Sequence, residues 1–578
     1  MQQLVDYKFN IQLANWTPLA ARYYNNFNND EIASLSEAFK RYNDMSRTIV
    51  YLAFENFYAT GGGLGAVIKF LPEEIVNSGE RFIFISPFFS NISSMQKAVE
   101  AKEIKEVYSD GKITVGKKQV NYTLYSGTFG SVNAYYIKAE GFFSGTPTPY
   151  DVDSDTLLQD SFFFTSATVD VLNRTKNCDN LLIHANDWET APISISILDA
   201  LIDGKINSAK TVITLHNSYD VSLPKKVLTK FKKRVTGAKT VLQYALPYFD
   251  APISTVSWPY AAEMIHDTLQ SGYFTSHLID VFRENSPVGI NNGLFGSNNR
   301  EMPTEKKELL KFKKKQATAL WDILDNNHDK RIYGKIKIPK KTFDKPLFFM
   351  SGRMDLMQKG FDTIFHAFRK MKRGSAALVF SPSITNDSER KHLQFFIDIA
   401  EELDGDIEIW PFRIDREAYG HFLSGASWLL MPSIYEPFGA ANEGFLHSTP
   451  VIARATGGLW TQIVSHKEVA IPHFLTTKRD GGSALSTGIL YREEYIGNAD
   501  DWRSIFSLPC EKRVDNPLYQ SIVDSAYFAL LEGVKLFNTR SDYLEMILSG
   551  GRSLDSFSWM DSVKKYKLLY NSVQRSAI

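Results

Sequence analysis

Two basic side chains stand six residues apart in the segment SGRMDLMQKGFD (351–362), directly after an apolar run. Arg353 offers a planar fork of N–H donors and Lys359 offers a point charge. At the end of a strand, such a pair could neutralise a departing diphosphate group. A surface pair with solvated head groups is the alternative that this segment leaves open.

A second group of polar residues and glycines lies between residues 433 and 459, in the segment SIYEPFGAANEGFLHSTPVIARATGGL. Glu436 follows an apolar run, Glu443 falls on the next helical pattern, and Gly457 and Gly458 follow the next run. Carboxylates at these positions could accept hydrogen bonds from sugar or ribose hydroxyls. The glycine turn could offer backbone N–H donors to a phosphate.

A third group comes from the first half of the chain. The cluster TGGGLG (60–65) contains Gly62 and Gly63, which could bring the backbone close to a ligand or could form a purely structural turn. His184, Asp187 and His216 follow other apolar runs and could orient sugar hydroxyls, although a hydrogen-bonded structural histidine fits the same pattern.

The elements that position these residues form two series of buried strands. Near-continuous apolar runs separated by helical patterns or turns are typical of parallel sheets with both faces covered. The first series comprises residues 48–54, 81–87, 180–187 and 211–217, and the second comprises 346–352, 375–381, 407–412, 427–433 and 449–455. A polar, Lys-rich stretch between about 297 and 345 separates them. We therefore expect two Rossmann-like α/β domains that face each other across a cleft.

Composition narrows the class of protein. The chain has 578 residues, with 65 basic and 65 acidic side chains, so we expect no broad nucleic-acid-binding or membrane-binding surface. Two cysteines are too few for a disulfide scaffold or a structural zinc site. No long apolar window and no signal-peptide pattern is present, which predicts a cytoplasmic protein.

Several of these segments, in order from about residue 48 to 465, resemble those of the bacterial glycogen and plant starch synthases, family 5 of the retaining glycosyltransferases. The segment TGGGLGAV is similar to that family's Lys-Thr-Gly-Gly-Leu-Gly-Asp-Val loop, and HANDWETAP is similar to its His-Asp-Trp-His stretch. The family also has counterparts of the segments TLHN, TVSWPYAAEM and GINNGL. Two further features resemble the animal and fungal glycogen synthases: the sequence Ser-Gly-Arg that ends at Arg353, and the separation of six residues between Arg353 and Lys359.

The resemblance implies the GT-B fold and transfer of glucose from ADP- or UDP-glucose to an α-glucan, with retention at the anomeric carbon. It implies that Arg353 and Lys359 hold the diphosphate, that Glu436 contacts the transferred sugar and that Glu443 contacts the ribose. Gly62, Gly63, Gly457 and Gly458 would line the nucleotide-sugar site, and the cation pair would replace a metal ion, so no metal or other cofactor is expected.

The chain also departs from this family. The lysine of the glycine loop is replaced by Ala59 or Thr60, and Asn186 and Glu189 stand in place of histidines. These departures keep two alternatives open: a GT-B enzyme with another sugar or with a small or protein acceptor, and a catalytically silent glucan-binding subunit. The oligomeric state stays open too.

The expected domain bounds are an N-terminal extension (1–47), a first domain (48–320) and a second domain (340–552). A helix within 553–578 is expected to return to the first domain.

Overall fold

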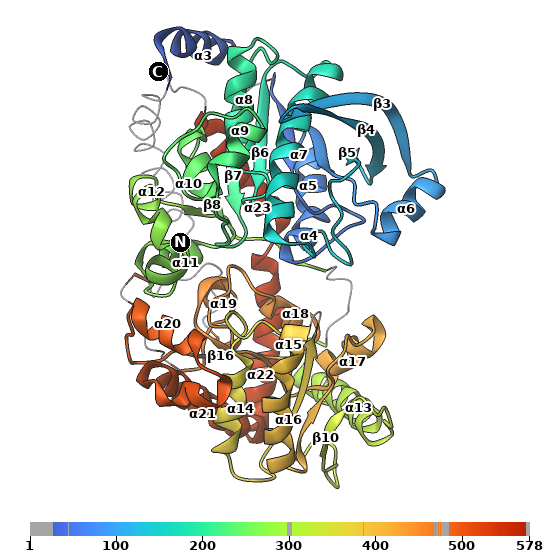
Figure 1. The fold of residues 1–578 in the computed structure, drawn as a ribbon. Coiled ribbons are helices and arrows are strands. Elements are labelled where there is room, and N and C mark those ends of the chain that lie inside the picture. The colour runs from blue at the N-terminus through green and yellow to red at the C-terminus, as the bar shows by residue number, and fades with distance from the viewer. Residues whose placement is uncertain are drawn as a thin grey trace. The chain divides into compact units, whose positions relative to one another are not determined.

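A computed structural model describes residues 27–43, 46–296, 303–384, 387–467, 469, 472, 474, 475 and 485–573. These residues form two compact units, each built around its own sheet (Figure 1). The N-terminal unit holds the described residues up to Ile265, then Phe274–Gly293 and the described residues from Ser558 onward. The C-terminal unit holds His266–Tyr273 and Leu294–Phe557.

The N-terminal unit contains a nine-stranded sheet in the order β3-β4-β5-β2-β1-β6-β7-β8-β9. Its parallel part is formed by β1 (Thr48–Leu52), β2 (Arg81–Pro87), β5 (Val132–Ala139), β6 (Leu181–Asn186), β7 (Ala209–Leu215), β8 (Ser254–Thr255) and β9 (Val288–Gly289). All residues of β6 and β7 are buried, which explains why most of their side chains are apolar. The expected strands of the first series are present.

An antiparallel extension at one edge of this sheet is absent from the sequence prediction. It consists of β3 (Ile104–Val115) and β4 (Lys118–Phe129), which pair with each other, and β4 also pairs with β5. Most side chains of β3 are exposed or half-buried. The strand therefore lacks the apolar run by which the buried strands are recognised.

The helices of the N-terminal unit cover both faces of the sheet. α7 (Ser154–Arg174) and α8 (Ile193–Ile202) pack together, as do α5 (Leu71–Asn77) and α23 (Trp559–Ser572) (Figure 1). The other helices are α3 (Asn29–Arg41), α4 (Gly63–Ile68), α6 (Ser93–Glu100), α9 (Lys225–Lys230), α10 (Val241–Ala245), α11 (Trp258–His266) and α12 (Ile279–Glu284).

Both ends of the chain contribute to this unit. Helix α3, from the predicted extension, packs on α8 and β7, while residues 1–26 lie outside the described residues. Trp559, the first residue of α23, stacks on Phe70 with ring centroids 5.9 Å apart. The Asp-x-Asp sequence at 151–153 leads into α7, and Asp153 caps this helix by accepting a hydrogen bond from the backbone N–H of Thr156.

The C-terminal unit contains a seven-stranded sheet in the order β10-β13-β12-β11-β14-β15-β16. The strands are β10 (Tyr333–Ile336), β11 (Leu347–Arg353), β12 (Ala377–Ser383), β13 (Asp406–Ile409), β14 (Trp428–Met431), β15 (Val451–Arg454) and β16 (Gly488–Tyr491). All pairs are parallel except β10 with β13. Because β11, β14 and β15 are neighbours, the loops at their carboxyl ends lie side by side.

Helices surround this second sheet. α14 (Phe361–Arg369) packs on α16 (Leu393–Glu402) and α21 (Pro517–Asn538), and α13 (Lys306–Asp325) packs on α17 (Arg416–Gly425) and α22 (Arg540–Ser553). The remaining helices are α15 (Asp387–Lys391), α18 (Ala441–Leu446), α19 (Gly457–Gln462) and α20 (Ala499–Ser507).

Helix α13 marks a difference from the expected domain bounds. The sequence places residues up to 320 in the first domain, whereas the structure groups this helix with the C-terminal unit. The physical reason is the packing of α13 on α17, where the buried Lys313 Nζ donates hydrogen bonds to the carbonyls of Ser424 and Ala426 at 2.7 and 2.9 Å. Across the described residues, no helix has the length and apolar character needed to cross a membrane.

Candidate active site

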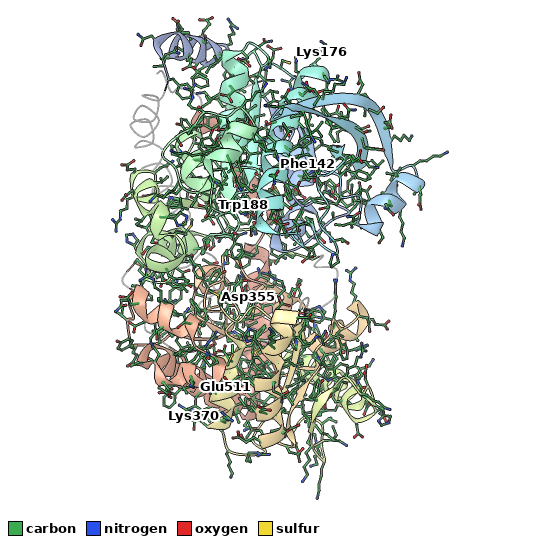
Figure 2. The ribbon with its side chains drawn as sticks, in the orientation of Figure 1. Phe142, Lys176, Trp188, Asp355, Lys370 and Glu511 are labelled. Carbon is green, nitrogen blue, oxygen red and sulfur yellow. The ribbon has the colours of Figure 1, made fainter. Side chains whose placement is uncertain are left out.

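The loop after β11 carries the two predicted cations. Strand β11 ends at Arg353, whose Nη2 donates to Gln358 Oε1 at 3.1 Å. The backbone N–H of Lys359 donates to the carbonyl of Asp355 at 2.7 Å, which folds the loop into a turn (Figure 2 labels Asp355). Arg353 is exposed and Lys359 is half-buried, so both head groups lie at the surface of the C-terminal unit.

Lys359 is paired with the predicted glutamate. Its Nζ lies 2.6 Å from Glu436 Oε2, and the same oxygen accepts a hydrogen bond from Ser433 Oγ at 2.8 Å. The backbone N–H of Ile434 also donates to the carbonyl of Gln358 at 2.7 Å, which joins the loop after β14 to the loop after β11. The structure thus brings Arg353, Lys359 and Glu436 to one edge of the sheet.

The glycine turn after β15 contacts the backbone of Glu436. The backbone N–H of Gly458 donates to the carbonyl of Glu436 at 3.1 Å. Gly457 has a left-handed φ of 44°, and a Cβ atom built on it would lie 1.8 Å from the same carbonyl oxygen. The predicted role of Gly458 as a donor to phosphate does not fit this geometry, because its N–H already holds the backbone of Glu436.

Glu443 is the third residue of helix α18 and is half-buried. Burial raises the pKa of its carboxyl above the ordinary value. Burial, with a smaller contribution from the Glu443 charge, raises the pKa of Tyr419 to about 12, and the Tyr419 hydroxyl lies 3.1 Å from Ser351 Oγ. Glu443 and Tyr419 therefore lie close enough to interact, in the same unit as Arg353.

A buried ionic network beneath these loops is absent from the sequence prediction. Arg454, at the end of β15, donates to the carbonyl of Ile434 at 2.5 Å and to Glu493 at 2.8 Å. Arg492 donates to the carbonyl of Ala455 at 2.7 Å. Burial alone would raise the pKa of Glu493, but the charges of Arg454 and Arg492 outweigh this effect and hold the pKa below its ordinary value. The sequence feature that could have indicated this network is Arg454, a basic residue within the apolar run 449–455.

The glycine loop of the N-terminal unit differs from the prediction. Glu55, after β1, accepts hydrogen bonds from the backbone N–H groups of Gly61 and Gly62 at 2.5 and 3.1 Å, and from the Tyr150 hydroxyl at 3.1 Å. A Cβ atom on Gly65 would lie 2.5 Å from the Glu55 carboxyl, so the absence of a side chain at Gly65 allows this carboxyl to lie against the backbone of the loop. The predicted phosphate contact through the Gly62 N–H is replaced by an internal carboxyl, while Gly63 begins helix α4.

Glu55 is one of three buried acidic groups at neighbouring strand ends. Asp187 and Glu189 follow β6, which pairs with β1, and both are buried. Burial raises the pKa of all three carboxyls. The charge of Glu55 adds to this effect at Asp187, whose pKa rises to about 7, and the charges of Asp187 and Glu55 add to it at Glu189. Glu189 Oε2 is buried without a hydrogen-bond partner. Asp187 also has a left-handed φ of 59°, a strained conformation that is often found at functional sites.

The two predicted histidines have different environments. His216, after β7, is half-buried; its Nε2 lies 2.9 Å from Asn186 Oδ1 and its backbone N–H donates to Asp187 at 2.6 Å. His184 is fully buried, with Nδ1 at 2.9 Å from the Tyr570 hydroxyl and Nε2 at 2.8 Å from Thr214 Oγ1. Burial lowers the pKa of His184 to about 3. A role of His184 in orienting sugar does not fit this position, because helix α23 covers it and both ring nitrogens are occupied.

The structure therefore assembles two groups of candidate residues, each within one unit. Arg353, Lys359, Glu436 and Glu443 lie at strand ends of the C-terminal unit. Asp187 and His216 lie at strand ends of the N-terminal unit, together with Glu55 and Glu189, which the sequence prediction missed. Such groups at the carboxyl ends of parallel strands are typical of nucleotide-binding and sugar-binding α/β proteins.

Comparison with known proteins gives matches over both units. The family model described as starch synthase catalytic domain matches residues 48–280, and the model of family 4 glycosyltransferases in conflict systems matches residues 322–486. The glycogen synthase of Petrotoga mobilis is 26% identical over 487 residues, 79% of this chain and 93% of the relative. The glycogen synthase of Thermodesulfovibrio yellowstonii is 25% identical over 546 residues, 89% of this chain and 95% of the relative.

Solved structures show the same fold. The catalytic domain of starch synthase IV from Arabidopsis thaliana, bound to ADP and acarbose, matches with a TM-score of 0.67 at 18% identity, and the match covers 92% of this chain and all of that chain. A sucrose-phosphate synthase from Thermosynechococcus elongatus matches with a TM-score of 0.50 at 15% identity, over 91% of this chain and 98% of that chain. Together with the sequence matches, the two parallel-dominant sheets show a glycosyltransferase with the GT-B fold that is similar to the glycogen and starch synthases.

Proposed function

We propose that this enzyme transfers glucose from a nucleotide-diphosphate sugar, ADP- or UDP-glucose, to an α-glucan, with retention at the anomeric carbon. The observation that carries the proposal is the pairing of Lys359 with Glu436, beside Arg353, at the carboxyl ends of neighbouring strands. Two cations and a carboxylate held in this way form an anion site that also has an acceptor for hydroxyl hydrogen bonds.

The two cations act on the leaving group. As the bond between the anomeric carbon and the diphosphate breaks and a bond to the acceptor hydroxyl oxygen forms, negative charge develops on the diphosphate oxygens, which take up the hydroxyl proton. The Arg353 guanidinium and the Lys359 ammonium stabilise that charge, and because both are fixed before the reaction, little reorganisation is needed. The proposal accordingly assigns no step to a metal ion or another cofactor.

The carboxylates recognise the hydroxyl groups of the donor. Glu436 contacts the transferred sugar, and binding of the diphosphate to Lys359 weakens the ion pair that holds this carboxylate in the free protein. Glu443 accepts hydrogen bonds from the ribose hydroxyls. Asp187 and His216 in the N-terminal unit contribute on the acceptor side, where buried carboxyl groups suit a neutral sugar better than a phosphate.

The choice of glucose and of an α-glucan follows from the matched proteins. The curated relatives are named glycogen synthases, and the plant starch synthase was solved with ADP and acarbose. We extend these properties to the present chain as part of the proposal, together with a cytoplasmic location.

The proposal is tested with a panel of nucleotide sugars. The purified protein is incubated with each sugar, with and without glycogen, and the release of nucleoside diphosphate is followed. Glycogen-dependent release from ADP-glucose or UDP-glucose is expected. Release that occurs only with a different sugar or a non-glucan acceptor would contradict the proposed substrates, and a folded protein that turns over no donor would contradict catalysis altogether.

A further inference from the structure

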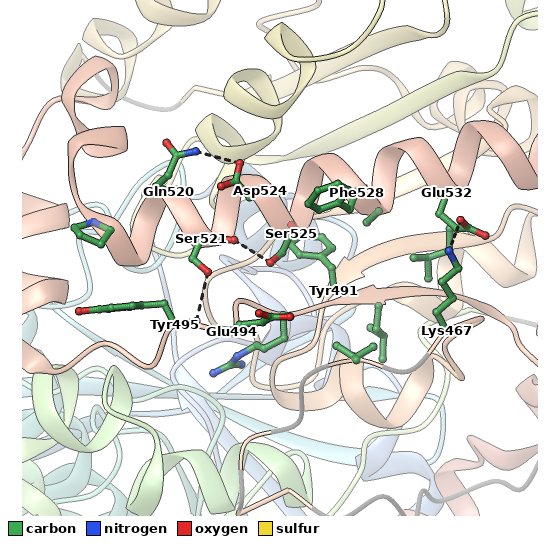
Figure 3. Close-up of a pocket in the computed structure, with 16 residues that line it drawn as sticks. Lys467, Tyr491, Glu494, Tyr495, Gln520, Ser521, Asp524, Ser525, Phe528 and Glu532 are labelled. Atoms are coloured by element: carbon green, nitrogen blue, oxygen red, sulfur yellow. Dashed lines mark hydrogen bonds and ion pairs between the residues drawn. The ribbon is translucent and has the colours of Figure 1, made fainter.

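The C-terminal unit has a groove that is lined by none of the candidate sugar-binding or diphosphate-binding residues and shares only Arg492 with the ionic network described above. It is a pocket of about 660 Å³ between helix α21 on one wall and strand β16 with its following loop on the other (Figure 3). Its helical wall runs from Pro517 to Glu532, about 22 Å at the rise of an α-helix. The groove is therefore long enough for several linked sugar rings.

Exposed aromatic rings border this groove on both sides. Phe528 projects from α21 and is 66% exposed, and Tyr495, from the loop after β16, is 45% exposed (Figure 3). Polar side chains of the helix line the same groove. Gln520 Nε2 donates to Asp524 at 3.1 Å and Ser521 Oγ accepts from the N–H of Tyr495 at 3.4 Å, so the Gln520 amide oxygen and the Ser521 hydroxyl hydrogen can still bind ligand hydroxyl groups. Aromatic faces with hydrogen-bonding groups beside them match a pyranose, which has apolar faces and a polar rim.

The charges of the groove favour a neutral ligand. Four of the five ionic side chains that line it are paired: Lys467 with Glu532 at 2.6 Å, Asp524 with Lys370 at 2.5 Å, and Arg492 with Asp267 at 2.9 Å. The fifth, Glu494, is an exposed acid. This lining offers no set of unpaired cations for a phosphate or a nucleic acid.

The edge of the sheet also disfavours an added peptide strand. Ser465 forms a parallel bridge with Gly488 of β16, and the N–H of His466 donates to the Gly488 carbonyl at 2.9 Å. The N–H of Leu490 donates to Ser465 Oγ at 3.0 Å. The outer edge of β16 is thus occupied by the protein's own chain, and an extended peptide would lack the backbone groups that strand addition requires.

We propose that this groove is a second, non-catalytic binding site for α-glucan, in which Phe528 and Tyr495 stack on glucose rings of the polymer. The identity of the polymer rests on the proposed function. The site holds a branched or long glucan on the C-terminal unit while one chain end reacts, so it raises the affinity for the polymer and leaves short acceptors unaffected.

Affinity electrophoresis of the full-length protein in gels that contain glycogen tests this site. Phe528→Ala and Tyr495→Ala should each weaken glycogen binding about tenfold, the loss expected for one ring-sized apolar contact. Tyr333→Ala is the matched control, because Tyr333 is a 39% exposed aromatic of β10 in the same unit that does not line the groove. Transfer to maltotriose should stay unchanged in all three variants.

The outcomes separate this inference from the proposed function. Glycogen binding by Phe528→Ala and Tyr495→Ala equal to that of the wild type would overturn the second site, and so would an equal loss of transfer to glycogen and to maltotriose. Failure of the wild type to use maltotriose would instead count against the proposed function, because the gel measurement of the groove needs no turnover.

Discussion

Lys359 Nζ lies 2.6 Å from Glu436 Oε2, and this contact joins the loops that follow two neighbouring strands, β11 and β14. The backbone hydrogen bond from Ile434 to Gln358 fixes the same two loops independently of the charges. The cation therefore has a defined position before any diphosphate binds, which is the condition under which electrostatic stabilisation is most effective.

Replacement of Lys359 by alanine should lower turnover by about 10²–10³-fold, because the developing charge on the diphosphate loses one of its two cations. Steady-state kinetics with saturating donor measure this effect. Lys372→Ala is the control, since Lys372 is exposed in the same unit and should leave turnover unchanged. A Lys359→Ala variant as fast as the wild type would remove this residue from the site.

Gly457→Ala should destabilise the C-terminal unit by about 1–3 kcal/mol and reduce activity, because the new Cβ would lie 1.8 Å from the Glu436 carbonyl oxygen at a left-handed φ of 44°. Thermal unfolding and turnover are measured together. Gly63→Ala provides the contrast, since a Cβ there meets no atom within 4 Å and should leave the unfolding temperature nearly unchanged. Equal stability of the two variants would contradict this account of the turn.

Lys313 should make the C-terminal unit more stable as the pH rises. Burial lowers its pKa from 10.5 to about 7, so between these values the unfolded chain binds a proton that the folded chain does not. The free energy of unfolding should therefore increase from pH 7 toward pH 10.5, and Lys313→Met should remove this increase. Denaturant titrations at several pH values compare the two proteins; parallel pH profiles would show that Lys313 is charged in the fold.

Glu189 should have the opposite effect in the N-terminal unit. Burial, and then the charge of Asp187, raises the pKa of Glu189 well above 4.5, so the folded state keeps a proton that the unfolded state loses. Wild-type stability should fall relative to Glu189→Gln as the pH rises above about 4.5, because only the wild type must take up a proton when it folds. Glu140→Gln, at an exposed position, should follow the wild type. A constant difference between wild type and Glu189→Gln across this range would be inconsistent with a protonated Glu189.

The sequence predicted those strands whose residues form a continuous apolar run, because such a run has a single physical cause in a buried strand. Runs such as 48–54 and 346–352 are apolar because both faces of the strand are covered, and β1 and β11 form there. The strands β3 and β4 were missed because exposed edge strands carry many polar residues. The helix expected near the C-terminus is α23, which lies in the N-terminal unit.

The candidate site was predictable in part for a similar reason. Arg353, Lys359 and Glu436 follow apolar strands, and parallel strands bring their carboxyl ends together. Local pattern does not reveal which group a backbone N–H will bind, so the capture of Gly61 and Gly62 by Glu55 was not foreseen. The sequence places His184 and His216 alike at strand ends, but His184 lies inside β6, where Tyr570 packs on it, whereas His216 follows the end of β7.

The most direct test of the account is the transfer of labelled glucose from ADP-glucose or UDP-glucose to glycogen, followed by digestion of the product with an enzyme specific for α-1,4 linkages. Retention at the anomeric carbon predicts that the label enters the polymer and that this digestion releases it. Label that never enters the polymer, or that enters it in a form resistant to the α-specific enzyme, would contradict the proposed reaction.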